Sequence, residues 1–140
     1  MIVSTRGRYA LRVLIDLAQH EGSGYIAMKD IAERQEISKK YMEQIMPALT
    51  KNGLVEGVHG QRGGYRLTRP PEDYSVGEIL RATEGDLAPV ACLSCKAEPC
   101  SRAAECKTIA MWTRFNEITN EYFDSISIAD LVNPTKHGNT

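Results

Sequence analysis

Four cysteines are the residues of this sequence whose type and spacing could do chemistry together. Cys92, Cys95, Cys100 and Cys106 fall within 15 positions, and the 140-residue sequence contains no other cysteine. Clustered thiols bind zinc or an iron–sulfur cluster, or they pair as disulfides. The sequence has no apolar leader segment and no membrane-spanning stretch, so we expect a cytoplasmic protein with reduced thiols and no membrane partner. A metal or cluster site is therefore favoured over a disulfide knot.

The spacing of these cysteines, C-x2-C-x4-C-x5-C, leaves the bound group open. Four thiolates suit a [2Fe–2S] or [4Fe–4S] cluster, and they suit tetrahedral zinc equally well. Alternatively, Cys92 is a spare thiol beside three ligands, or the segment is a metal-free thiol switch or binds nothing. A dithiol enzyme built on Cys92 and Cys95 would need a thioredoxin-like setting, which the surrounding sequence does not predict. No other catalytic motif stands out, so we expect a protein that is not an enzyme.

The chain before the cysteines predicts a helix-turn-helix. Apolar residues at helical spacing predict helices over 6–19, 28–34 and 39–52, and Ser38 is a natural N-cap for the third. A short turn before a helix that opens with basic residues is typical of DNA-binding proteins. Lysine suits phosphates, glutamine can pair with adenine, and glutamate can accept from cytosine. The candidate DNA contacts in this helix are Ser38, Lys39, Lys40, Tyr41, Glu43 and Gln44. A solvated helix face is the alternative.

A glycine-rich hairpin follows the third helix. Strands over 54–58 and 65–68 flank a loop over 59–64, which is the position of a wing in a winged helix. Glycines would let the backbone approach the duplex closely, and a cation at the tip would enter the minor groove. The candidate DNA contacts here are His59, Arg62, Gly63, Gly64 and Tyr65. An ordinary flexible hairpin tip is the alternative, but the order of helix, turn, helix and hairpin favours DNA.

The charge balance differs between the two halves of the chain. Residues 1–69 contain 11 Lys and Arg against 7 Asp and Glu, whereas residues 70–140 contain 6 against 11. A basic first half and an acidic second half indicate that only the first half meets a polyanion such as DNA.

A long helix predicted over 108–124 carries many apolar residues for a surface helix. It could pack on its own domain, or it could pair two-fold with a second chain. We favour a homodimer, because one winged helix reads only half of a palindromic operator in double-stranded DNA. The candidate dimer residues are Ile109, Trp112, Phe115, Thr119, Tyr122 and Phe123.

We expect a mainly α fold with a small β-hairpin, that is, a winged helix-turn-helix domain followed by a long dimerisation helix. The expected parts are the DNA-binding domain over 1–71, a connecting helix and cysteine segment over 72–107, the dimerisation helix and a short helix over 108–133, and a flexible tail over 134–140.

These motifs, taken in order, resemble the IscR/CymR-type winged-helix regulators, the Rrf-two family, over residues 1–133. The residues that carry the resemblance include Tyr9-Ala10-Leu11-Arg12, Ile37-Ser38, Tyr41, Glu43-Gln44, Asn52-Gly53-Leu54-Val55, Gly63-Gly64-Tyr65-Arg66-Leu67 and Val76-Gly77-Glu78-Ile79. Each piece is common, but the ordered set is specific. The resemblance implies a homodimeric bacterial transcription regulator whose dimer helices cross. It also implies that the cysteine segment holds an iron–sulfur cluster near the dimer interface.

This sequence differs from the cluster-binding members of the family at the positions of the cluster ligands. Cluster-binding relatives use three cysteines spaced like the last three here, and the iron–sulfur assembly regulator adds a histidine where this chain has Ile109. Other relatives use a carboxylate or histidine from the partner's first helix, where Arg8 and Arg12 stand here and cannot ligate. Cys92 is therefore the candidate fourth ligand. We expect a repressor controlled by this cluster, and the alternative is a winged-helix regulator or interaction module with structural zinc or a thiol switch.

Overall fold

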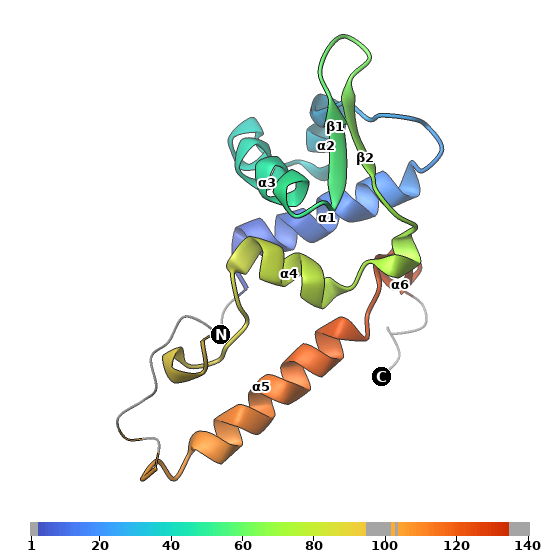
Figure 1. Cartoon of the computed structure of the whole chain (residues 1–140). Helices are drawn as coiled ribbons and strands as arrows, with labels where there is room; N and C mark the ends of the chain where they lie inside the picture. The colour runs from blue at the N-terminus through green and yellow to red at the C-terminus, as the bar shows by residue number, and fades with distance from the viewer. Residues whose placement is uncertain (1–2, 95–101, 103, 135–140) are drawn as a thin grey trace.

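The computed structural model describes residues 3–94, 102 and 104–134, which form a mainly helical fold with one small hairpin (Figure 1). The α-helices are α1 (Thr5–Gln19), α2 (Met28–Gln35), α3 (Lys39–Lys51), α4 (Val76–Glu84), α5 (Ile109–Asp124) and α6 (Ile128–Val132). The strands are β1 (Val55–Val58) and β2 (Gly64–Leu67), and the short 3₁₀ helices are η1 (Pro71–Asp73) and η2 (Ala91–Leu93). The fold class predicted from the sequence is confirmed. Cys95, Cys100 and the tail from 135 onward lie outside the described residues.

Serine hydroxyls begin four of the helices. Each accepts a hydrogen bond from the amide three residues ahead, which pairs a backbone donor that the helix itself leaves without a partner. The cap residues are Ser4 for α1, Ser38 for α3, Ser75 for α4 and Ser127 for α6. The helices α1, α2, α3 and α5 begin within a residue of their predicted starts.

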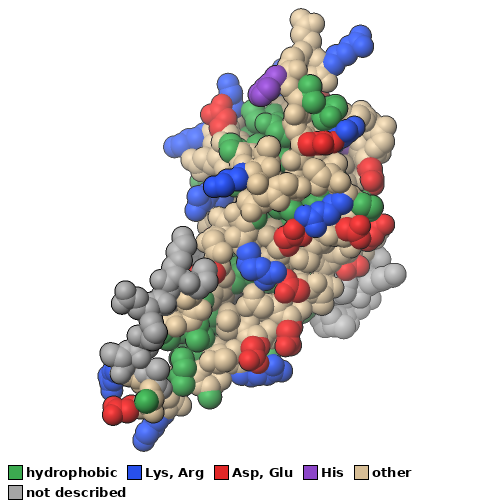
Figure 2. All heavy atoms as spheres, viewed as in Figure 1, with side chains coloured by type: hydrophobic (Ala, Val, Ile, Leu, Met, Phe, Trp, Pro, Cys, Tyr) green, Lys and Arg blue, Asp and Glu red, His purple; other side chains and the backbone are tan. Residues whose placement is uncertain are grey.

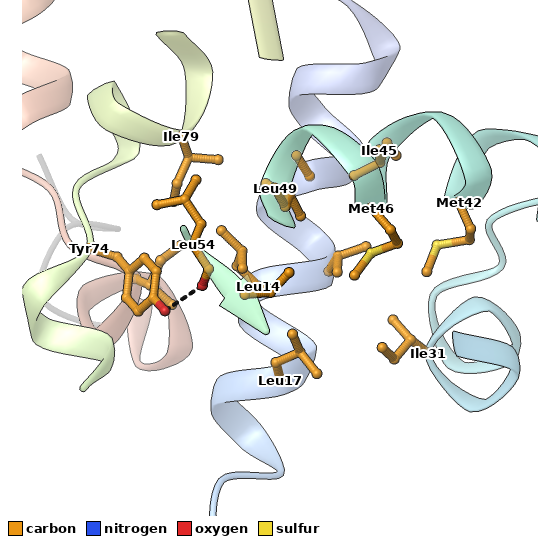
Figure 3. Packing of buried hydrophobic residues seen from close by; sticks show 14 of the residues in the cluster. Leu14, Leu17, Ile31, Met42, Ile45, Met46, Leu49, Leu54, Tyr74 and Ile79 are labelled. Atoms are coloured by element: carbon orange, nitrogen blue, oxygen red, sulfur yellow. Dashed lines mark hydrogen bonds between the residues drawn. The ribbon is translucent and has the colours of Figure 1, made fainter. Parts of the chain in front are cut away.

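The main hydrophobic core surrounds α1, which contacts α2, α3, α4, α6 and β2. Leu14 of α1, Met46 of α3 and Ile79 of α4 are fully buried in this core (Figure 3). Tyr74 lies at its edge and donates its hydroxyl to the carbonyl oxygen of Leu54 at 2.6 Å. Burying this ring stabilises the fold and also satisfies its polar end, so Tyr74 fixes the chain after the wing against the start of β1.

Asp16 is the buried carboxylate that joins α1 to α2. Its side chain is 1% exposed, and Arg34 donates two hydrogen bonds to it at 2.8 and 2.9 Å. Gln35 donates a third at 3.1 Å. Burial alone would raise the pKa of Asp16, but the hydrogen bonds from Arg34 and Gln35, with the charges of Arg34 and His20, lower it overall. The ionised carboxylate therefore sets the position of α2 on α1.

The C-terminal helices attach beside α4. The amide of Val76 donates to the carbonyl oxygen of Ile126 at 2.8 Å, and the amide of Ile128 donates to that of Tyr74 at 3.0 Å. A second apolar cluster, formed by Val76, Leu80, Leu87 and Ile126, lies under this junction. From there α5 runs away from α1, α2, α3 and the hairpin (Figure 1). Within the described residues, no helix combines the length and apolar character needed to cross a membrane.

Candidate DNA interface and cysteine segment

The start of α3 presents a polar face outward from the core. Met42, Ile45, Met46 and Leu49 are buried. The six candidate DNA contacts on the same helix are all exposed, namely Ser38, Lys39, Lys40, Tyr41, Glu43 and Gln44. Lys39 and Glu43 form a weak exposed ion pair at 3.8 Å, which a phosphate could displace. Figure 2 shows Lys and Arg side chains around α3 and at the end of the wing.

Tyr41 has a second role that its sequence position does not reveal. Its ring meets the ring of Tyr9 edge-on, with centroids 5.4 Å apart. The guanidinium carbon of Arg12 lies over the Tyr9 ring, 5.1 Å from its centroid. Such aromatic and cation–π contacts hold partly exposed side chains in place. The first turn of α3 is therefore braced on the first half of α1.

The turn between α2 and α3 contains a residue in an uncommon conformation. Glu36 has φ +53°, which glycine or asparagine usually adopts, and the following amide of Ile37 donates to Ala32 at 3.0 Å. The sequence carries no glycine to signal this left-handed residue. The turn is tight because this conformation ends α2 and lets Ser38 begin α3 two residues later.

The wing is an antiparallel pair in which Val55 faces Leu67 and Val58 faces Gly64. A third segment joins it, because Ile26 and Tyr65 exchange two backbone hydrogen bonds of 2.8 Å each. His59 and Arg62 are exposed at the tip, as a groove-contacting role requires. Tyr65, in contrast, is half-buried and packs against the core.

The glycines of the wing have a reason different from the predicted one. A side-chain carbon on Gly63 would lie 2.1 Å from the carbonyl oxygen of Val58, and one on Gly64 would lie 2.2 Å from that of Ile26. Both distances are far below a van der Waals contact. These two glycines are therefore required inside the fold, where strands approach closely, whether or not DNA is bound.

The long helix α5 has two different faces. Met111, Phe115, Ile118 and Tyr122 recur every three or four residues and are 45–58% exposed. Ile109, Trp112, Thr119 and Phe123 are half-buried within the chain, and Phe123 packs on the apolar cluster under α4. Of the six predicted dimer residues, only Phe115 and Tyr122 lie on the exposed stripe. The exposed stripe also contains Met111 and Ile118, so the six predicted residues are divided between two faces of α5.

The contact between α4 and the end of α5 combines the apolar packing of Phe123 with polar bonds. Arg81 donates to Asn120 at 2.9 Å and to Asp124 at 2.5 Å. A side-chain carbon on Gly77 would lie 2.0 Å from the same Asp124 oxygen, so α4 needs a glycine where α5 approaches. This junction sets the direction in which α5 leaves the rest of the chain.

The described cysteines lie at the two ends of the cysteine segment. Cys92 is exposed within η2, and the loop that contains it is closed by a 2.5 Å hydrogen bond from Ser94 to Asp86. Cys106 is half-buried just before α5, with its sulfur 3.4 Å from the hydroxyl oxygen of Thr108. The hydrogen bond with this hydroxyl lowers the pKa of Cys106, which favours the thiolate that binds metals.

The chemistry of the donor set fits a soft metal or a cluster, because thiolates are its ligands. Among residues 3–94, 102 and 104–134, no group of three or more cysteine, histidine or acidic side chains is placed to hold a metal ion. Cys95 and Cys100, two of the four predicted ligands, lie outside those residues.

Comparison with known proteins identifies the family. Residues 3–134 match the Rrf2 family, described as an iron-dependent transcriptional regulator. This chain belongs to the Rrf2 family. It is 35% identical over 133 residues to the HTH-type transcriptional regulator IscR of Erwinia tasmaniensis, covering 95% of this chain and 79% of that protein. An Rrf2 chain of this kind is a transcription regulator and not an enzyme.

Solved structures of Rrf2 proteins show the same fold. The structure of CymR, the global cysteine regulator of B. subtilis, is 34% identical and superposes with a TM-score of 0.76, covering 95% of this chain and 97% of that one. The structure of T. potens IscR is also 34% identical, with a TM-score of 0.73, and covers 100% of this chain and 92% of the other. These matches confirm the winged-helix fold and the resemblance on which the sequence analysis relied.

Proposed function

We propose that this Rrf2 regulator is a homodimeric, cytoplasmic repressor that binds a palindromic operator in double-stranded DNA. The observation that carries the proposal is the exposed polar start of α3 on a winged-helix scaffold. The buried apolar side of this helix fixes its position, and the Asp16–Arg34 ion pair fixes α2 beside it. A helix held in this way can enter the major groove with its N-terminal residues leading.

Within this interface, different side chains carry affinity and specificity. Lys39 and Lys40 would neutralise phosphates, while Glu43 and Gln44 would meet base edges one turn further along α3. His59 and Arg62 would enter the neighbouring minor groove from the wing. Tyr65, Gly63 and Gly64 shape the wing that carries those two side chains.

The exposed stripe of α5 supports the dimer. Four large apolar side chains at three- and four-residue spacing form the seam that pairs helices with each other. A second copy of the chain would cover Met111, Phe115, Ile118 and Tyr122 at a two-fold axis. Two copies of α3 would then contact two half-sites whose spacing is set by the junction between α4 and α5.

Regulation through an iron–sulfur cluster bound by Cys92, Cys95, Cys100 and Cys106 completes the proposal. The four thiols, the lowered pKa of Cys106 and the family's iron dependence support it. A bound cluster would supply a redox-sensitive cross-link within the segment that precedes α5. Because the same segment follows α4, its state can alter how α5 and the winged helix are related.

A metal-free thiol switch is the second candidate. Exposed Cys92 and Cys106, whose pKa is lowered by the hydrogen bond with Thr108, suit oxidation as well as metal binding. The similarity to a global cysteine regulator is in keeping with this reading. A structural zinc site would use the same four thiolates.

Anaerobic purification followed by an absorption spectrum and analysis of iron, sulfide and zinc separates these candidates. Matched iron and sulfide, with DNA affinity that changes on cluster removal, supports the cluster-controlled repressor. One zinc per chain supports a structural site, and a metal-free protein whose DNA affinity responds to oxidants supports the switch. Absence of DNA binding at low salt would contradict the regulator itself.

A further inference from the structure

Glu84, the last residue of α4, contacts the beginning of α1 across 80 residues of sequence. Its Oε1 atom accepts hydrogen bonds from the backbone amide of Ser4 at 2.9 Å and from the Ser4 hydroxyl at 2.5 Å. A side-chain carbon on Gly7 would lie 2.5 Å from the same oxygen, so the missing side chain there makes room for the carboxylate. Glu84 is half-buried in this position. In this contact Ser4 donates the hydrogen bonds, and Gly7 leaves the space that the carboxylate of Glu84 occupies.

The electrostatics of α1 give this carboxylate a specific role. The first turn of α1 contains no acidic residue, and it places Arg6 and Arg8 at the positive end of the helix dipole. Negative charge stabilises that end of a helix, and positive charge destabilises it. Glu84 therefore supplies the negative charge that the first turn of α1 lacks. It also orients Ser4, whose hydroxyl oxygen accepts from the amide of Gly7.

The same end of α1 contacts the recognition helix. Tyr9 lies about one turn beyond the cap, and its ring meets that of Tyr41 in the first turn of α3. A change in how α1 begins would therefore reach the residues that surround Lys40 and Gln44. Figure 1 shows the end of α4 beside the beginning of α1, with the cysteine segment continuing from that end.

On the other side, Glu84 is joined directly to the cysteine segment. Gly85 ends α4 with φ +90°, and Leu87 is buried in the apolar cluster under α4. The loop closed by the hydrogen bond between Ser94 and Asp86 contains Cys92. Cys92 therefore lies within the short folded loop that begins directly after Glu84 and Gly85.

We propose that Glu84 is the positioning residue through which the state of the cysteine segment reaches the start of α3. The inference rests on the proposed function, because it names the route by which the segment regulates DNA binding. In one state of the segment the carboxylate holds Ser4 and the start of α1. In the other, the shift of the turn after Glu84 withdraws it, and the brace between Tyr9 and Tyr41 loosens.

The test compares wild type, Glu84→Ala and Glu84→Gln, with Glu72→Ala as a control. Glu72 is an exposed glutamate in η1, at the opposite end of α4, so its replacement makes the same change in charge. For each protein, DNA affinity is measured with the cysteine segment loaded with its reconstituted cluster and after cluster removal. Iron and sulfide content is measured on the same samples.

The expected result is a loss of response without a loss of cluster. Allosteric coupling typically changes affinity about 5- to 150-fold between two states, and in Glu84→Ala we expect less than about a twofold change. Glu72→Ala keeps the wild-type ratio. Glu84→Gln keeps an acceptor oxygen but loses the charge, so its ratio falls between the two. A wild-type ratio in folded Glu84→Ala overturns the inference.

Hydrogen exchange at the amides of Ser4 and Gly7 provides a readout that is independent of DNA and of the cluster. It is measured before and after alkylation of the cysteines with iodoacetamide. We expect alkylation to alter exchange at these amides in wild type and in Glu72→Ala, but not in Glu84→Ala. If cluster removal does not change the wild-type DNA affinity but this exchange pattern is observed, the proposed cluster control fails. The coupling between the cysteine segment and Ser4 through Glu84 is then still supported. An exchange response that persists in Glu84→Ala overturns the proposal that the signal passes through Glu84.

Discussion

The winged-helix half, whose core surrounds α1 and includes Ile79 of α4, and the half formed by α5 are held by different kinds of contact. Around α1, large apolar side chains such as Leu14, Ile31 and Leu49 are fully buried. Along α5, by contrast, no residue is fully buried, and its contact with α4 combines the packing of half-buried Phe123 with polar bonds from Arg81. The first half is complete within one chain. The second half leaves apolar surface that a second chain would cover.

This difference indicates where rigidity and adjustment lie. An apolar core is close-packed and resists small displacements, so it can hold a recognition helix in one position. Polar bonds at a partly exposed junction exchange with water at low cost, so the angle between α5 and the winged helix can change. A regulator whose recognition helix is fixed in its domain, and whose angle between that domain and α5 can change, can respond to a signal without refolding either part.

A cavity in the winged-helix core should have the largest effect. Replacing Leu14 with Ala removes a fully buried side chain from the centre of α1, and we expect a loss of about 2–5 kcal/mol of unfolding free energy. Urea denaturation monitored by circular dichroism measures it. A loss below about 1 kcal/mol, the cost of a well-tolerated core change, would show that this half is not the rigid one.

A charge in the exposed stripe of α5 should act on assembly and leave the fold of the chain in place. Ile118→Asp places a carboxylate in the proposed seam, so we expect the dimer to weaken by about 2–4 kcal/mol, the range of interface hot spots. Sedimentation velocity over a range of concentrations measures the change. Thr113→Asp introduces the same side chain at an exposed position outside the stripe and should leave the dimer intact. Equal behaviour of the two variants would remove this stripe from the interface.

The buried ion pair of Asp16 should give the winged-helix half a pH dependence. Because the pKa of Asp16 is lowered in the folded state, its contribution is present above the unfolded-state pKa of about 3.9 and is lost as pH falls through the folded value. At pH 7 we expect Asp16→Asn to cost about 1.5–3 kcal/mol, the range for hydrogen bonds to a charged group. Denaturation at a series of pH values should show this cost shrinking in acid. Asp73→Asn, which changes an exposed carboxylate, serves as the control.

Two substitutions on α3 should separate affinity from specificity and give the smallest changes. Lys40→Ala should weaken binding to all DNA sequences and reduce the salt slope by about one. Gln44→Ala should instead alter the preferred base, by about 1–3 kcal/mol at one operator position. Fluorescence anisotropy with matched and mismatched operators at several salt concentrations distinguishes these results. A uniform loss in Gln44→Ala would argue against base contact.

Local features of the sequence predicted the elements well. Ser38 marked the start of α3, because a cap needs only one hydroxyl and an amide three residues away. The exposed face of α3 followed from the spacing of Met42, Ile45 and Leu49, since a helix repeats every 3.6 residues. Helix caps and helical periodicity depend on residues that are close in the chain, so they can be recognised without knowing the whole fold.

Features that depend on distant neighbours were harder to predict. The two faces of α5 both carry large side chains, so spacing alone did not show that Phe123 packs inside the chain while Ile118 is exposed. The close contacts at Gly63 and Gly64 were not predicted, because the carbonyls that exclude a side chain there belong to Val58 and Ile26. In both cases the deciding atoms lie in another element.

The sequence by itself determined that this chain is a winged-helix regulator with four clustered thiols, because periodicity, caps and residue order are local properties. Only the tertiary structure brought Glu84 to Ser4 and Asp16 to Arg34. The physical reason is that a carboxylate's partner is set by how helices pack, and packing depends on the burial of apolar surface over the whole chain. The contacts that would carry a signal from the cysteines to DNA are therefore tertiary contacts.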